Sequence, residues 1–147
     1  MLKVDFDFAG LKSSVDEWRE EVKDAVRPAA QAGIQVLYES AKRKVRRSTK
    51  GHWFHGTSFK KNGTKYWFDA GSLDRSIYQV YSKDRSTDQS ATYHLGWNYK
   101  EAPYGHMVEY GTRKARARSF LNAVKPLQSY ALEISREVLF QNLKSFK

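Results

Sequence analysis

A long stripe of apolar side chains constrains the fold of this 147-residue chain more than any other feature. Within residues 15–41 the apolar and small residues recur at spacings of three and four, which predicts one amphipathic helix of about eight turns. Ser14 and Glu17 form a capping-box pattern at its start, and the helix is expected to end near Val45. Pro28 lies inside the stripe and predicts either a kink or a division into two helices.

Alternating apolar and polar residues predict a small antiparallel sheet. Residues 2–8 alternate with period two, and Gly10 ends this short strand. Residues 73–81 and 91–98 read as two further strands, with the polar segment 83–88 as the turn between them. These two strands are therefore expected to form an antiparallel hairpin.

The C-terminal third predicts a short helix followed by a long one. Pro103 is expected to begin the short helix, with Met107 facing inward, and Gly111 to end it. The final helix is expected to begin near Ser119, with Pro126 tolerated in its first turns. Its apolar stripe comprises Phe120, Val124, Leu127, Ala131, Ile134 and Val138.

Residues 48–71 are rich in Gly, Ser, Thr and Lys and show no helical period. They predict a long loop, with a short irregular hairpin around Asn62 and Gly63, that becomes ordered on assembly. The whole chain, residues 1–147, is expected to form a single α+β domain. In it, two long amphipathic helices pack on a small antiparallel sheet.

Composition excludes several classes of function. The chain has no cysteine, which rules out disulfides, thiolate catalysis and cysteine-based zinc sites. No segment approaches the ~20 apolar residues that a membrane-spanning helix needs, and the first residues do not resemble a signal peptide. We therefore expect no membrane association and a cytoplasmic protein in the cell that makes it.

The net charge of +10 is unevenly distributed along the chain. Residues 1–41 carry a net charge of −3, and residues 42–147 a net charge of +13. Such asymmetry indicates that part of the fold faces a polyanion or an acidic protein surface, with solubility alone as the alternative.

The histidines and carboxylates show no pattern typical of an active site. His52, His55, His94 and His106 lack the spacing of metal ligands, so neither a metal nor another cofactor is expected. His106 and Glu109 are three residues apart on the predicted short helix and are the best candidates for an acid–base pair. Helical neighbours of this kind are more often a solvated or capping pair, so no catalytic residue is assigned.

Two runs of basic side chains are candidate contacts for DNA or for a protein partner. The first comprises Lys42, Arg43, Lys44, Arg46, Arg47 and Lys50, and the second Arg113, Lys114, Arg116 and Arg118. Aromatic residues nearby in the sequence could stack on unpaired bases, namely Trp53, Phe54, Tyr66 and Trp67. Because no motif for sequence-specific recognition accompanies them, we favour non-specific lining of a DNA passage or pairing with acidic neighbours.

The most specific feature is the sequence YGHMVEYGT of residues 104–112, followed by RARSFLNA of residues 116–123. Together they resemble the YAxxVEFGT…ARPFLxPA signature of a tail-completion family in long-tailed double-stranded DNA phages. Upstream, AGSLDRSI of residues 70–77 resembles the TGxLRxSI element of that family. The chain departs from the signature at Gly105, where the family usually has Ala, and at Ser119, where it usually has Pro.

The resemblance implies a structural virion protein rather than an enzyme. Such a protein forms a ring, expected to be a hexamer, between the head-closure (connector) protein and the tail terminator or tail tube protein. The genome passes through this ring, so non-specific contact with packaged double-stranded DNA is also expected. Expected contacts with neighbouring subunits or partners comprise Glu109, Tyr110, Gly111, Thr112, Arg113, Arg116, Arg118 and Phe120. The basic residues expected to face DNA or a partner comprise Lys42, Arg43, Lys44, Arg46 and Arg47.

The signature also suggests local roles for its residues. Gly111 permits a reversal of the chain, Glu109 anchors the following loop through an arginine or the amides near Thr112, and Phe120 holds the last helix to the core. Two alternatives stay open: a tail terminator that caps the tail tube, and a small basic nuclease or RNA-binding protein. A tight helix–turn–helix connection without any assembly role would also account for the signature.

Overall fold

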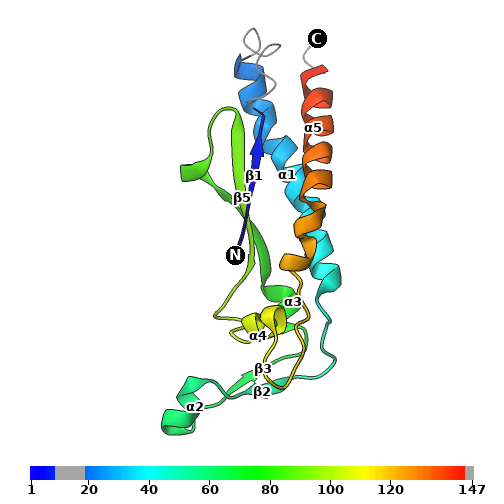
Figure 1. Cartoon of the computed structure of the whole chain (residues 1–147). Helices are drawn as coiled ribbons and strands as arrows, with labels where there is room; N and C mark the ends of the chain where they lie inside the picture. Colours follow the sequence, from blue (N-terminus) through cyan, green and yellow to red (C-terminus); the bar gives the residue numbers. More distant parts are fainter. Residues whose placement is uncertain (9–18, 145–147) are drawn as a thin grey trace.

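The computed structural model describes residues 1–8 and 19–144, without the side chains of residues 19–22 and 144. The fold is elongated and combines helices with a small antiparallel sheet, which confirms the predicted α+β class (Figure 1). In chain order the elements are β1 (Leu2–Asp7), α1 (Arg19–Lys44), β2 (His52–Phe54), α2 (Thr57–Asn62), β3 (Tyr66–Phe68), α3 (Ser72–Ser76), β4 (Ile77–Ser82), the 3₁₀ turn η3 (Lys83–Arg85), β5 (Ser90–Trp97), α4 (Gly105–Tyr110), the 3₁₀ helix η4 (Asn122–Leu127) and α5 (Gln128–Lys144).

The main sheet has the strand order β1-β5-β4, and both pairings are antiparallel. The predicted hairpin of β4 and β5 is therefore confirmed, and the N-terminal strand β1 joins it on the other side of β5. On one face, Phe6 lies opposite Ala91 and Val4 opposite Tyr93. These four side chains are buried, because α1 packs against this face of the sheet.

The α1 helix runs without interruption from Arg19 to Lys44, so Pro28 does not divide it. Pro28 is exposed, and water on that side of the helix can serve the carbonyl that loses its N–H donor. The buried face of α1 is rich in small residues, among them Ala29, Gly33 and Ala41. The predicted capping box of Ser14 and Glu17 lies outside the described residues.

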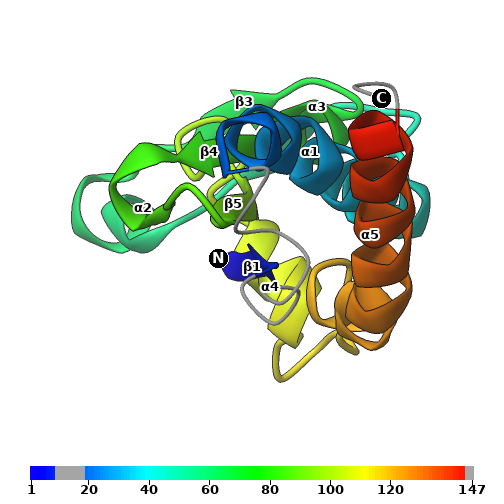
Figure 2. The same cartoon turned by 90° about the horizontal axis from the view of Figure 1, so that it is seen from above.

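The α5 helix packs along α1, where the two backbones come close together (Figure 2). A β-carbon placed on Gly33 would overlap the hydroxyl of Ser135 and would lie 2.5 Å from Cε1 of Phe6 and 2.8 Å from the carbonyl oxygen of Ala131. Three elements, α1, α5 and β1, therefore meet at this glycine. We call the contact between α1 and α5 around Gly33 the small-residue seam.

The second long helix is shorter than predicted. The α5 helix begins at Gln128 rather than near Ser119, because residues 122–127 form the 3₁₀ helix η4 around Pro126. Proline has no N–H to donate to the preceding turn, which disfavours a regular α-helix there. Among the described side chains of α5, residues 128–143, only Ala131, Ser135 and Leu139 are fully buried.

The strand predicted over residues 73–81 begins only at Ile77, because residues 72–76 form the helix α3. Gly71 starts this helix with a φ of +76°. Two serine hydroxyls stabilise the turn by donating to backbone oxygens: Ser72 to Asp69 at 2.6 Å and Ser76 to Leu73 at 2.7 Å. These local hydrogen bonds favour a helical turn over a strand.

Residues 48–71, predicted as a long loop, contain the two-stranded sheet of β2 and β3 with α2 between the strands. Asn62 and Gly63 do not form the hairpin turn. Gly63 instead ends α2 with a φ of +72°, and its N–H donates to the carbonyl of Phe59 at 2.9 Å. The ordering of this segment on assembly stays a prediction. Among residues 1–8 and 19–144, no helix is long and apolar enough to cross a membrane.

Candidate functional site

The carboxylate of Glu109 is the centre of the signature segment. Its side chain is almost fully buried and accepts four hydrogen bonds from residues that follow it by ten to thirteen positions. Backbone N–H groups of Phe120 and Leu121 donate to Oε2 at 2.8 and 3.0 Å. The N–H of Asn122 and the hydroxyl of Ser119 donate to Oε1, both at 2.8 Å. We call this set of hydrogen bonds the Glu109 clamp.

The clamp keeps Glu109 ionised. Burial disfavours the charged carboxylate, but the backbone N–H groups of residues 120–122 and the Ser119 hydroxyl together lower the pKa of Glu109 below its usual value. The prediction that Glu109 anchors the following loop was therefore right, but the predicted partners were wrong. The donors are not an arginine or the amides near Thr112, but the amides that begin η4.

Two expected contact residues lie inside the chain's own fold. Phe120 is fully buried and packs edge-to-face on Trp97, with the ring centroids 5.6 Å apart. Together with the burial of Glu109, this corrects the expectation that these two side chains contact a neighbouring subunit. Tyr110, in contrast, is 68% exposed at the end of α4.

Between Tyr110 and the clamp, the basic loop of residues 111–118 is fixed by backbone hydrogen bonds. The N–H of Gly111 donates to Met107 at 2.8 Å, and the N–H of Arg118 donates to Val108 at 2.7 Å. Inside the loop, the N–H of Thr112 donates to Ala115 at 2.8 Å. The basic side chains of this loop are exposed and form no ion pair with any described residue; they comprise Arg113, Lys114, Arg116 and Arg118.

We expect Gly111→Ala to destabilise the chain by about 2 kcal/mol. Gly111 has a φ of +79°, and a β-carbon there would lie 2.7 Å from the N atom of Ala117. Both the backbone strain and the overlap oppose any side chain at this position. Urea unfolding measures the loss, and Gly63→Ala is the matched control. Gly63 also has a positive φ, but no atom lies within 4 Å of a β-carbon built there. An equal loss in both variants would show that only the backbone conformation matters.

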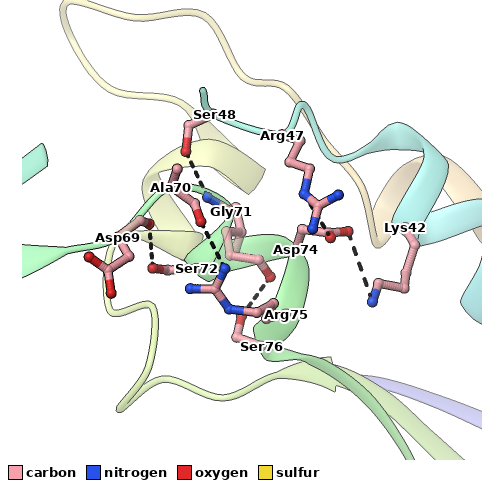
Figure 3. A network of polar contacts seen from close by, with 11 residues as sticks. Lys42, Arg47, Ser48, Asp69, Ala70, Gly71, Ser72, Asp74, Arg75 and Ser76 are labelled. Atoms are coloured by element: carbon pink, nitrogen blue, oxygen red, sulfur yellow. Dashed lines mark hydrogen bonds and ion pairs between the residues drawn. The ribbon is translucent and has the colours of Figure 1, made fainter. Parts of the chain in front are cut away.

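The first basic run lies at the end of α1, where part of it is engaged within the chain (Figure 3). Asp74 of α3 forms ion pairs with Lys42 at 4.0 Å and with Arg47 at 3.7 Å. The guanidinium group of Arg43 donates to the hydroxyl of Ser40 at 3.1 Å. Lys44 and Arg46 are exposed and form no ion pair with a described residue.

Asp74 was missed by the sequence reasoning, although it belongs to the segment AGSLDRSI. Its ion pairs hold α3 against the end of α1, and the N–H of Gly71 strengthens the connection by donating to the Ser48 hydroxyl at 3.0 Å. The guanidinium group of Arg75 donates to the carbonyl of Ala70 at 2.8 Å in the same network. Lys42 and Arg47 therefore contribute to the fold as well as to the surface charge.

The two basic runs, which are far apart in the sequence, meet around one hollow of about 420 Å³. Arg46 contributes from the first run and Arg116 and Arg118 from the second. The remaining lining residues come from β2, α3, α4 and adjoining loops and comprise Ser48, His52, Gly71, Leu73, Tyr104, Met107, Val108, Thr112 and Ala115. None of the described residues that line this hollow is acidic. Met107, predicted to face inward, is partly exposed in its wall.

The structure does not support an acid–base pair of His106 and Glu109. His106 is exposed, and its Nδ1 lies 2.7 Å from the carbonyl oxygen of Pro103. The Glu109 carboxylate is enclosed by the four donors of the clamp. No three His, Asp or Glu side chains of the described residues are placed to hold a metal ion together.

The aromatic residues around the first basic run divide into two sets. Phe54 faces the body of the protein and packs near Tyr104, so it is not available for stacking on a base. Trp53, Tyr66 and Trp67 are each about half exposed. Comparison of the chain with protein-family models, with curated proteins and with solved structures found no match.

Proposed function

We propose that this chain is a structural virion protein that forms a ring at the head–tail junction of a long-tailed phage and has no catalytic activity. The Glu109 clamp is the observation that carries the proposal. The buried carboxylate of Glu109 accepts four hydrogen bonds, and these fix the end of an exposed basic loop. A charged loop with a fixed backbone, whose basic side chains form no ion pair with a described residue, is suited to contact with a neighbouring molecule.

The resemblance to the tail-completion signature supports the same proposal, because its most specific residues are those of the clamp and the loop. In the ring, expected to be a hexamer, the loop contacts the next subunit, the head-closure protein or the tail terminator or tube protein. The hollow between the two basic runs is suited to an acidic side chain of such a neighbour. Passage of double-stranded DNA through the ring is compatible with the excess of positive charge.

The alternative of a small nuclease receives less support. A general base must reach a substrate proton, whereas the carboxylate of Glu109 is buried and saturated with donors. Purified protein is expected to show no nuclease activity. Activity that is lost in His106→Ala, but kept in a variant of an exposed lysine such as Lys44→Ala, would contradict the structural proposal.

Electron microscopy of particles that lack the protein tests the function directly. We expect full heads without tails beside unattached tails, because the ring that joins them is missing. Overlong tails would instead show that the protein terminates the tail tube. Normal particles would contradict both assignments.

Reversing the charge of the basic loop is expected to block particle assembly without unfolding the chain. Arg116→Glu/Arg118→Glu changes two exposed side chains that make no ion pair with a described residue. The free energy of unfolding should therefore change by less than about 0.5 kcal/mol. Loss of complementary contacts should nonetheless abolish joining. The measurement is the yield of joined particles after complementation, with Lys83→Glu/Lys100→Glu as the control for net charge. If the loop variant joins particles normally but releases the genome abnormally, its arginines face DNA.

A further inference from the structure

Residues 50–69, which contain β2, α2 and β3, form an arm at the end of the fold that also carries the basic loop (Figure 1). One face of its two-stranded sheet packs around the ring of Tyr104. The centroid distances from this ring are 4.7 Å to His52, 5.3 Å to Phe68 and 6.1 Å to Phe54. This face of the arm therefore packs against the body of the protein at Tyr104.

The opposite face of the arm presents two tryptophans. Trp53 and Trp67 are directly paired across the two strands, with ring centroids 5.3 Å apart in an edge-to-face arrangement. Each is 51% exposed, which is unusual for the largest apolar side chain. A protein gains nothing in its own stability from this exposure, so the pair is suited to contact with another molecule.

The geometry of both tryptophans is fixed within the chain. The indole N–H of Trp67 donates to Oδ1 of Asp69 at 3.0 Å, and the ring lies over Gly51, where a β-carbon would overlap it. The ammonium group of Lys65 lies over the ring of Trp53, 4.7 Å from the ring centroid. Contacts within the chain that restrict these two side chains reduce the conformational entropy that they lose in a complex.

The charge around the pair is almost entirely positive. Residues 50–69 contain four exposed lysines, namely Lys50, Lys60, Lys61 and Lys65. Asp69 is the one acidic residue of the arm, and it is hydrogen-bonded to Trp67. A partner that covers the tryptophans therefore meets the ammonium group of Lys65 directly and approaches an arm with a net positive charge.

We propose that the arm is a docking site for an acidic polypeptide segment that carries apolar side chains. The apolar groups of this segment would cover Trp53 and Trp67, and its carboxylates would pair with Lys65 and with other lysines of the arm. Tryptophan is enriched among the few residues that contribute most of the binding energy in protein interfaces. This inference goes beyond the proposed function, because it rests on the arm and not on the basic loop.

Single-stranded nucleic acid fits the tryptophan pair less well. Stacking of a base needs a free ring face. Lys65 covers one face of Trp53, Gly51 lies against Trp67, and the edge-to-face contact takes up further ring surface. The exposed parts that remain suit aliphatic and aromatic side chains better than stacked bases.

The test uses the full chain labelled with 5-fluorotryptophan, whose fluorine resonances are assigned by replacing each tryptophan with phenylalanine. The probes are a short peptide of Glu and Asp residues with Leu-Phe at its centre, the same peptide with Lys in place of the acids, and oligothymidylate. We expect the acidic peptide to shift the resonances of Trp53 and Trp67. The resonance of Trp97, which is partly buried at the end of β5, should not shift. Affinity should fall about ten-fold or more in Trp67→Ala and in Lys65→Glu.

A matched control is Tyr130→Ala, because Tyr130 on α5 is exposed to a similar extent, 52%, and lies outside the arm. Its affinity for the acidic peptide should be unchanged. Lys65→Glu leaves the ring–ring contacts of the arm in place but removes the ammonium group over Trp53. An unchanged Trp97 resonance in this variant shows that the chain is still folded. Tighter binding of oligothymidylate than of the acidic peptide would overturn the proposal in favour of nucleic acid. Concentration-dependent shifts without any probe would indicate a second copy of the chain, and no shift with any probe would also overturn the proposal.

Discussion

Replacing Glu109 with alanine is expected to destabilise the folded chain by about 3–5 kcal/mol, because three backbone N–H groups and one hydroxyl lose an ionised acceptor inside the protein. The loss would also free the start of η4 and the end of the basic loop. Urea unfolding at neutral pH measures the effect. Ser119→Ala, which removes one of the four donors, is the control and should cost about 1 kcal/mol.

The clamp also predicts how stability depends on pH. Since the folded-state pKa of Glu109 is lowered from the usual 4.5, its contribution is fully present above that value. It is lost as the pH falls through the folded-state pKa. Glu109→Gln should remove this part of the acid dependence. It should also lower the free energy of unfolding by about 2 kcal/mol at neutral pH, because the NH₂ group of the glutamine would face the N–H and O–H donors of the clamp. An unchanged acid dependence in Glu109→Gln would contradict an ionised Glu109.

The second large effect is expected for Gly33→Ala in the small-residue seam. Alanine favours a helix over glycine by about 1 kcal/mol, so helix propensity alone predicts stabilisation. The added methyl group, however, would overlap Ser135 and approach a backbone oxygen of α5 to 2.8 Å. Overpacking of a close helix contact costs about 1–3 kcal/mol or more, and we expect a net loss of about 2 kcal/mol.

Thermal and urea unfolding of Gly33→Ala decide between propensity and packing. Ser135→Ala is the matched control, because the buried Ser135 hydroxyl has no hydrogen-bond partner among the described residues. Removing that hydroxyl should be neutral or slightly stabilising. In the double variant Gly33→Ala/Ser135→Ala, part of the stability lost in Gly33→Ala should be recovered, because the hydroxyl that the new methyl group overlaps is gone. Stabilisation by Gly33→Ala alone would show that α1 and α5 are not in such close contact.

The elements with a long or regular pattern could be predicted from the sequence. Period-two alternation in β1 and β5 and the long stripe of α1 reflect burial of one face, and that burial is visible in the order of residues. The helix α3 could not be predicted, because Leu73 and Ile77, four residues apart, fit a helical turn as well as a strand. Its stabilisation depends on hydrogen bonds from serines and on ion pairs with distant residues.

The same limit applies to the site. The signature identified Glu109 and Gly111 as important, yet the donors to the carboxylate follow from the path of the loop rather than from any spacing rule. Arg46 and Arg116 are seventy positions apart and come to one hollow only through the packing of α1, α3 and α4. Contacts between residues so distant in sequence leave no periodic trace in the chain.

The segregation of charge has a consequence for the rate of encounter. Residues 42–71 and 111–120 hold thirteen of the 26 lysines and arginines and only one acid, so the rest of the chain has a net charge of −2. Because these two segments share one end of an elongated fold, the molecule is an electric dipole along its length (Figure 1). Near any polyanion it experiences a torque before contact and approaches with its basic end first. Such alignment raises the association rate constant at low ionic strength and disappears once the Debye length is shorter than the molecule.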